Sequence, residues 1–154
     1  MTSNQQPTES FEQLCRHERQ LLDEILADVE FLSLRESYLQ AASRFGELRH
    51  LLEEHILTEE RLVLPLFIER TGDPHQLADR IRNEHNALAD LVELVAAAIS
   101  RWDRTAFIDR VADLRAALKV HHEDEEAQLH PGVADVLKTA ADWRLLCLTA
   151  GLLR

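Results

Sequence analysis

Apolar residues recur at intervals of three and four along most of the chain, which is the spacing of one face of an α-helix. This periodicity predicts four helices, over about residues 9–30, 35–70, 74–100 and 104–130. We expect the second helix to be interrupted near Gly46 or tightened near Pro65. The run Thr71-Gly72-Asp73-Pro74 predicts a turn, with Gly as a helix stop and Pro as the start of the third helix.

The order of these elements predicts an all-α protein. We expect an up-and-down antiparallel four-helix bundle, because candidate ligand residues recur in the same order on its first two and last two helices, and an additional C-terminal helical segment over residues 133–152. Residues 1–8 are predicted to be a disordered tail, and residues 9–154 a single domain with one core. The apolar segment 133–152 would pack on the bundle or against a partner, such as a second copy of the chain.

Two pairs of polar residues fall in the middle of apolar helix faces. His55 and Glu59 form the first pair, and His121 and Glu125 form the second. A His and a Glu four residues apart lie one above the other on a helix, so each pair can point at one place. A buried Glu is rare unless it is paired or binds a metal, because removing its charge from water is costly. Each pair therefore indicates a cation site.

A single His precedes each pair at a similar distance. His17 on the first helix stands before His55, and His85 on the third helix stands before His121, which indicates an internal repeat. The apolar stripe of the first helix comprises Phe11, Leu14, Leu21, Leu22, Ile25 and Val29. His17 lies at the edge of this stripe and Glu18 nearer its centre, so a rotation of the helix would place both near the interior and make Glu18 a partner of the site or an extra ligand.

Together these residues could hold two metal ions bridged by the carboxylates. The candidate ligands are His17, His55, Glu59, His85, His121 and Glu125. Mixed imidazole and carboxylate ligands suit iron, manganese or zinc. Of the other histidines, His122 is an alternative to His121. His50, which follows Glu47 by three residues, is expected on the solvated face, and His75 and His130 are expected to be structural or exposed.

The charge and the apolar runs limit the partners and the compartment. A net charge of −11 argues against nucleic acid and against anionic membrane surfaces, because both bind basic patches. The apolar run 145–153 is too short to span a bilayer, and the N-terminus does not resemble a signal peptide, so we expect a cytoplasmic protein.

The paired His-x-x-x-Glu motifs, each followed by Pro six residues after the Glu and preceded by a lone His, resemble the hemerythrin-like (HHE cation-binding) domain over about residues 10–131. The resemblance implies an up-and-down four-helix bundle with a non-haem di-iron centre, in which an oxide or hydroxide can bridge the two iron ions. It assigns ligand roles to the six candidate residues named above. Manganese or zinc could substitute for iron.

The third helix departs from the oxygen-carrying hemerythrins, which have two His one turn apart there. The neighbours of His85 at that spacing are Ile81 and Ala89. The site is therefore more similar to the His/Glu di-iron centres of bacterial iron–sulfur cluster repair proteins and of the eukaryotic iron-sensing member. The expected function is to bind, sense or detoxify dioxygen, nitric oxide or peroxide. The alternative is a metal-responsive interaction or regulatory module without turnover, for which segment 133–152 would be the output.

Overall fold

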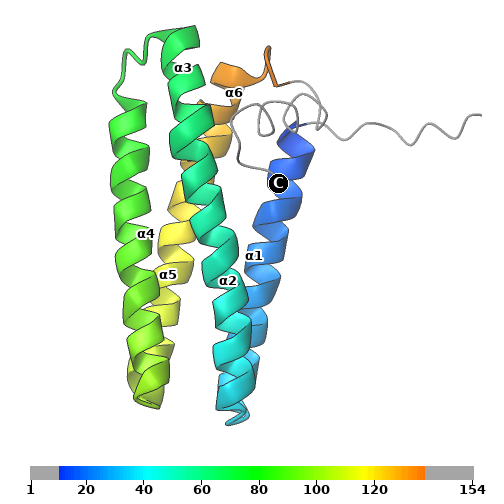
Figure 1. Ribbon diagram of the computed structural model, residues 1–154, viewed down its shortest axis with the longest axis vertical. Coiled ribbons are helices and arrows are strands. Elements are labelled where there is room, and N and C mark those ends of the chain that lie inside the picture. The colour runs from blue at the N-terminus through cyan, green and yellow to red at the C-terminus, as the bar shows by residue number, and fades with distance from the viewer. Residues whose placement is uncertain (1–10, 138–154) are drawn as a thin grey trace, which may run out of the picture.

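The computed structural model describes residues 11–137, which form four long helical rods side by side (Figure 1). The first rod is α1 (Phe11–Leu34). The second consists of α2 (Tyr38–Thr58), the π-helical segment η1 (Glu59–Val63) and α3 (Leu64–Thr71). The third is α4 (Leu77–Ser100), and the fourth consists of α5 (Arg104–Asp124), the π-helical segment η2 (Glu125–Leu129) and α6 (His130–Val133).

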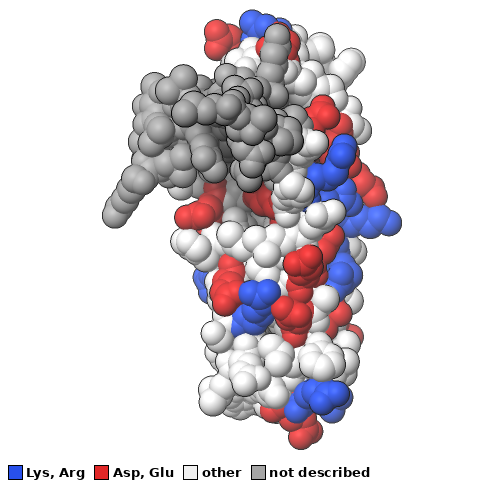
Figure 2. Space-filling model, turned by 90° about the vertical axis from the view of Figure 1, so that its right-hand side faces the viewer, with Lys and Arg blue, Asp and Glu red and all other residues white. Residues whose placement is uncertain are grey.

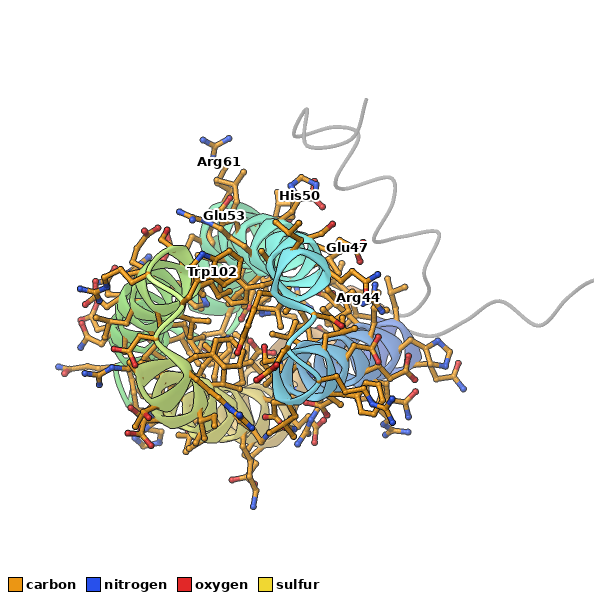
Figure 3. All side chains as sticks on the ribbon, turned by 90° about the horizontal axis from the view of Figure 1, so that it is seen from below. Arg44, Glu47, His50, Glu53, Arg61 and Trp102 are labelled. Carbon is orange, nitrogen blue, oxygen red and sulfur yellow. The ribbon has the colours of Figure 1, made fainter. Side chains whose placement is uncertain are left out.

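Successive rods run in opposite directions and are joined at alternate ends of the molecule (Figure 1). α1 packs along α2, and α4 packs along α5, so the two halves of the repeat form two helical hairpins. Viewed along the bundle axis, the helices surround an interior filled with side chains (Figure 3). The predicted all-α four-helix bundle is confirmed.

Residues in the connections fix where the rods end. Gly72 has a left-handed φ of 73°, which ends α3, and the carboxylate of Asp73 then accepts hydrogen bonds from the backbone N–H groups of Leu77 (2.7 Å) and Ala78 (3.1 Å). α4 therefore begins at Leu77 and not at the predicted position 74. At the other end of the bundle α1 continues to Leu34, so the second rod begins later than predicted.

The core consists of two apolar clusters separated along the bundle axis. The lower cluster in Figure 1 comprises Leu22, Ile25, Leu26, Val29, Phe45, Leu48, Leu52, Leu88, Val92, Val95, Ala98, Phe107, Val111, Leu114 and Leu118. The upper cluster comprises Phe11, Val63, Leu64, Phe67, Leu77, Ala78, Ile81, Leu129, Val133 and Leu137. On the second, third and fourth rods, the candidate metal ligands lie in the short interval between the two clusters. The packing of apolar side chains above and below therefore holds this polar layer in place.

Each half of the repeat contains one π-helical turn, and each begins at the Glu of the motif. In η1 the N–H of Leu64 bonds the carbonyl of Glu59, five residues earlier, and Pro65 follows at once. η2 repeats this arrangement at its own Glu and Pro. Proline has no N–H to donate, so the regular α-helical hydrogen-bond ladder cannot continue through this turn. π turns of this kind are frequent at functional sites.

The π turn changes which residues face the core. A straight α-helix would place Leu62, Val63 and Leu66 on the arc of His55 and Glu59. Leu62 and Leu66 are only partly buried, whereas Val63, Leu64 and Phe67 are buried. A π turn widens the helix by one residue and so advances the buried face by one position. The expected tightening near Pro65 was therefore wrong, and the second rod passes Gly46 without interruption.

Gly132 on α6 provides a test of the packing between the two halves. A Cβ at this position would overlap the ring of the buried Phe67 on α3. We expect Gly132→Ala to destabilise the protein by about 1–3 kcal/mol, as overpacked core positions do. Gly46→Ala is the matched control: no atom lies within 4 Å of its added Cβ, so it should stabilise the helix by about 0.5–1 kcal/mol. Urea unfolding of both variants measures the difference, and equal effects would contradict this packing.

The described surface is charged but not of one sign. On the α1 side, acidic and basic side chains are interspersed, and uncharged side chains gather at the lower end (Figure 2). No helix within residues 11–137 is long and apolar enough to cross a membrane. The predicted tail 1–8 and most of the predicted segment 133–152 lie outside the described residues. Oligomerisation through that segment therefore remains a prediction.

Candidate metal centre

Five of the six candidate ligands meet in the polar layer between the two apolar clusters. They come from three rods: His55 and Glu59 from the second, His85 from the third, and His121 and Glu125 from the fourth. Each offers one ligand atom, and these atoms all lie within 4.8 Å of one another. Four of the residues are buried and His55 is nearly so. The i, i+4 motifs of the two halves thus converge on one point.

A carboxylate lies behind each of the three imidazoles. Nδ1 of His55 lies 2.8 Å from Oε1 of Glu18 on α1. Nδ1 of His85 lies 2.9 Å from Oε1 of Glu60 on η1. Nδ1 of His121 lies 2.8 Å from Oε2 of Glu84 on α4. When ionised, a carboxylate can only accept, and each Nδ1 then carries the proton and donates it. This arrangement fixes the tautomer and orientation of a metal-binding imidazole and raises its basicity.

With Nδ1 donating outward, each neutral ring presents the lone pair of Nε2 to the centre. Nε2 of His55 is 3.4 Å from Nε2 of His121 and 2.9 Å from Oε1 of Glu125. Oε2 of Glu59 contacts Nε2 of His55 closely and lies 3.6 Å from Nε2 of His85 and 3.7 Å from Nε2 of His121. Lone pairs of nitrogen and oxygen directed at one region repel one another unless a cation or protons lie between them.

Three atoms in this cluster lack a hydrogen-bond partner although they are fully buried. Within the described residues these are both carboxylate oxygens of Glu59 and Nε2 of His85. An unsatisfied buried charge is costly, and native proteins rarely retain one. A metal ion coordinated by these atoms would satisfy all three, and mixed imidazole and carboxylate donors suit iron, manganese or zinc. The residues present therefore fit a metal centre.

In the metal-free protein, protons take the place of the cation. Burial would lower the pKa of His55 and His121, but the neighbouring Glu59 and Glu125 outweigh it, raising the pKa of His55 well above its usual value and that of His121 to about 10. Burial would likewise raise the pKa of both carboxyls, but the charge of His55, together with the other imidazoles that surround them, holds the pKa of Glu59 well below, and that of Glu125 below, the usual value. Metal binding must therefore displace protons from the imidazoles.

These shifts predict how stability without metal depends on pH. His121 has a folded pKa of about 10 against about 6.5 when unfolded, so its contribution is fully present below pH 6.5 and is lost as the pH rises through 10. We expect the metal-free protein to lose stability between about pH 6.5 and 10, by an amount on the order of a few kcal/mol. Thermal unfolding in chelator across this range measures the effect. A melting temperature that stays constant or rises would show that the imidazoles do not hold these protons.

The sixth predicted ligand, His17, does not enter the cluster. Its side chain is exposed on α1, and the neighbouring Glu18 turns inward to bond His55. The inward-facing side of α1 has regular helical spacing and comprises Phe11, Cys15, Glu18, Leu22, Ile25, Leu26, Val29 and Ser33. Leu21, which the predicted stripe included, is 41% exposed. Without Leu21 the stripe rotates, which places Glu18 inside and His17 outside.

Two further histidines are buried beside the cluster. His122, the predicted alternative to His121, is 5% exposed, and its ring centroid lies 6.3 Å from that of His55. His130, expected to be structural or exposed, is 7% exposed and stacks edge-on against Phe11. His122 was predicted only as an alternative to His121, and His130 was not predicted as a ligand, because the pattern of a straight α-helix places both at the edge of the apolar face or outside it.

His50 and Glu47 lie on the outer face of α2, as expected. Both side chains point away from the bundle (Figure 3). His50 pairs with Glu54 at 3.2 Å, and Glu47 pairs with Arg44. Their Glu-x-x-His spacing is therefore part of the solvated surface.

A sequence profile of the hemerythrin HHE cation-binding domain matches residues 8–138 of the chain. The match covers all four rods and both His-x-x-x-Glu motifs. The chain belongs to the hemerythrin HHE cation-binding domain family. Its metal-binding character follows from the family together with the His/Glu cluster. Comparison with curated proteins and with solved structures gave no match.

The carboxylates behind the imidazoles of this hemerythrin-family cluster can be tested separately from the ligands. Glu60→Ala removes the acceptor at Nδ1 of His85 while leaving every inward-facing donor in place. We expect metal affinity to fall about 10- to 100-fold with little change in the stability of the metal-free protein. Glu69→Ala, on the exposed face of α3, is the matched control. Metal affinity is measured by competition with a chelator. Equal affinities of the two variants would show that Glu60 does not orient His85 for metal binding.

Proposed function

We propose that the chain holds two iron ions in the His/Glu cluster and uses them to bind, sense or detoxify dioxygen, nitric oxide or peroxide. The observation that carries the proposal is the convergence of five donor atoms within 4.8 Å, three of them imidazoles backed by carboxylates. His55, His85 and His121 would supply nitrogen ligands, and Glu59 and Glu125 would bridge the ions. Manganese or zinc would fit the same donors.

The donor count supports a reactive centre. Five protein side chains cannot fill the coordination of two six-coordinate ions, so positions stay open for a small ligand. Ferrous iron at such positions supplies a binding site for the diatomic gas or peroxide and the electrons for its reduction. The side chains of this chain orient the ions, keep the surroundings largely apolar above and below, and hold protons nearby.

The third helix supports a reactive or sensing role over reversible oxygen transport. Ile81 lies one turn before His85 and is fully buried in the upper apolar cluster. An apolar side chain therefore occupies the position at which the oxygen-carrying hemerythrins have a second His on this helix.

The test is the reaction of the reduced, iron-loaded protein with each small molecule in turn. Protein loaded anaerobically with ferrous iron is mixed with dioxygen, nitric oxide or hydrogen peroxide, and the visible spectrum and the amount of reactant consumed are followed. We expect at least one reactant to change the spectrum of the wild-type sample faster than the spectrum of a Glu125→Ala sample that contains the same amount of iron. Iron-loaded protein that responds to none of the three would contradict the proposal.

A further inference from the structure

A cavity of about 250 Å³ lies against the His/Glu cluster, between α1 and the fourth rod. One member of the cluster, Glu125, lines the cavity directly, and this residue is buried. Other residues of the lining are exposed, namely Glu12, Arg16 and Glu126. Within the described residues, the cavity therefore extends from the surface to a donor residue of the candidate metal centre.

The lining of this cavity is polar. Within residues 11–137 it consists of three glutamates, two arginines, two histidines and Cys15, without an aliphatic side chain and without Phe, Tyr or Trp. Arg19 and Glu126 form an ion pair at 2.7 Å, which ties the α1 wall to the η2 wall. A polar cavity of this size holds several water molecules, whereas an apolar cavity stays dry. We therefore expect water to fill it.

Other approaches to the centre are obstructed by apolar packing or by paired side chains. The two apolar clusters lie above and below the centre along the bundle axis. Glu60 and Glu84 bond Nδ1 of His85 and Nδ1 of His121, so each of these imidazoles has a carboxylate on its outer side. In the described part of the chain, the cavity thus offers a polar path to the centre that crosses neither apolar cluster.

We propose that this cavity is the entry chamber of the centre, and that it admits hydrogen peroxide in preference to dioxygen and nitric oxide. The proposal rests on the di-iron function proposed above and selects one of its three reactants. Hydrogen peroxide both donates and accepts hydrogen bonds, so it can replace water against a lining of carboxylates, guanidinium groups and imidazoles. The two diatomic gases are sparingly soluble in water and gain little from such a lining.

Reduction of one hydrogen peroxide molecule requires two electrons and two protons. Each of two ferrous ions would give one electron, the O–O bond would break, and two water molecules would form. The water of the chamber would carry the protons inward and receive the product. A one-electron donor would then return each ion to the ferrous state, so the reaction is tested as a single turnover of ferrous protein, which needs no added donor.

Water access to the centre can be measured without turnover. Protein is loaded with Mn²⁺, which suits the same donors, and the relaxation rate of solvent protons is recorded. Cys15→Phe places a ring in the chamber from the α1 wall, whereas Cys15→Ala removes the thiol and leaves the chamber open. We expect Cys15→Phe to lose most of the relaxation enhancement per bound Mn²⁺ and Cys15→Ala to keep it. Gln20→Phe, the same new side chain at an exposed position of α1, is the matched control.

Stopped-flow mixing of ferrous-loaded protein with each reactant measures the selectivity. At equal reactant concentrations, wild-type protein should react faster with hydrogen peroxide than with dioxygen or nitric oxide. In Cys15→Phe the rate with hydrogen peroxide should fall at least about tenfold, because entry then requires the walls to move. Cys15→Ala and Gln20→Phe should react as wild type does. Iron per chain is determined in every sample, so that loss of metal is not mistaken for loss of entry.

The outcomes separate this proposal from the proposed function. Wild-type protein that holds no iron, or that reacts with none of the three molecules, overturns the proposed function itself. A faster reaction with dioxygen or nitric oxide than with hydrogen peroxide overturns only the choice of reactant made here. Equal peroxide rates, or equal Mn²⁺ relaxation, in Cys15→Phe and Gln20→Phe overturn the entry chamber.

Measurements on wild-type protein decide the matter if Cys15→Phe fails to fold. The comparison of the three reactants needs no variant. Mn²⁺-loaded wild-type protein should also show rapid exchange of metal-bound water with solvent. A relaxation rate no higher than that of the metal-free protein, at full Mn²⁺ content, would contradict a water-filled path to the centre.

Discussion

Glu125→Ala should abolish metal binding, with an affinity loss of at least about 100-fold. Glu125 is 3% exposed and contacts Nε2 of both His55 and His121. Its removal takes away the charge that faces these imidazoles, so a divalent cation would meet only neutral rings and Glu59. Metal per chain after dialysis against a micromolar metal buffer measures the loss.

Glu59→Ala should have a comparable effect, because both oxygens of Glu59 are buried without a hydrogen-bond partner in the described residues. The chain offers a matched control for each variant. Glu126→Ala changes the next residue on η2, whose side chain is 47% exposed and pairs with Arg19, and Glu53→Ala changes an outward residue of α2. Both controls should keep full metal content. Full metal content in Glu59→Ala or Glu125→Ala would show that the carboxylate does not bridge.

Removing the metal should lower the stability of the protein substantially. A ligand that binds only the folded state stabilises it by about 4 kcal/mol when its free concentration is 1,000 times the dissociation constant. For a chain of this size the melting temperature should rise by roughly 8–16 °C on loading. The gain is expected because a metal ion would replace the protons of the cluster and would coordinate buried atoms that have no hydrogen-bond partner, at the place where three rods meet.

Differential scanning calorimetry with chelator and with metal measures this gain. Glu125→Ala protein, scanned in the same two buffers, shows how much of the change comes from metal binding elsewhere on the acidic surface. Equal melting temperatures of the wild-type protein in the two buffers would mean that the cluster stabilises the fold by its own hydrogen bonds alone.

Much of this architecture could be predicted from the sequence, because the determining signals are local and periodic. Apolar spacing located four helices to within a few residues. The repeated His-x-x-x-Glu motif placed His55, Glu59, His121 and Glu125 on the inner face, and His85 followed from its position in the repeat. Residues four apart on one helix face need no tertiary information to be brought together.

The errors arose where the helix phase was ambiguous or changed. On α1 the inclusion of the exposed Leu21 rotated the predicted stripe toward His17, whereas the spacing of Phe11, Cys15 and Glu18 with the leucines and Val29 marks the true face. The apolar pattern of one helix cannot show whether His17 or Glu18 faces the core when one additional apolar residue is present. The packing of the whole bundle selects between these two rotations of the helix.

The π turns explain the other difference. A phase calculated for a straight α-helix fails beyond Glu59 and Glu125, since one additional residue enters the turn at each site. The proline six residues after each Glu was visible in the sequence, but it is equally compatible with a kink or a helix end. The burial of His130, after the second π turn, was missed for this reason.

The metal content of protein purified without chelator tests most directly the proposal that the His/Glu cluster holds two iron ions. Iron, manganese and zinc per chain would be measured together with the near-ultraviolet and visible spectrum before and after exposure to air. We predict about two iron ions per chain and an absorption band that changes on exposure. Protein that contains none of these metals, and that also fails to take up ferrous iron anaerobically, would contradict the claim and leave His55, Glu59, His85, His121 and Glu125 as a structural network.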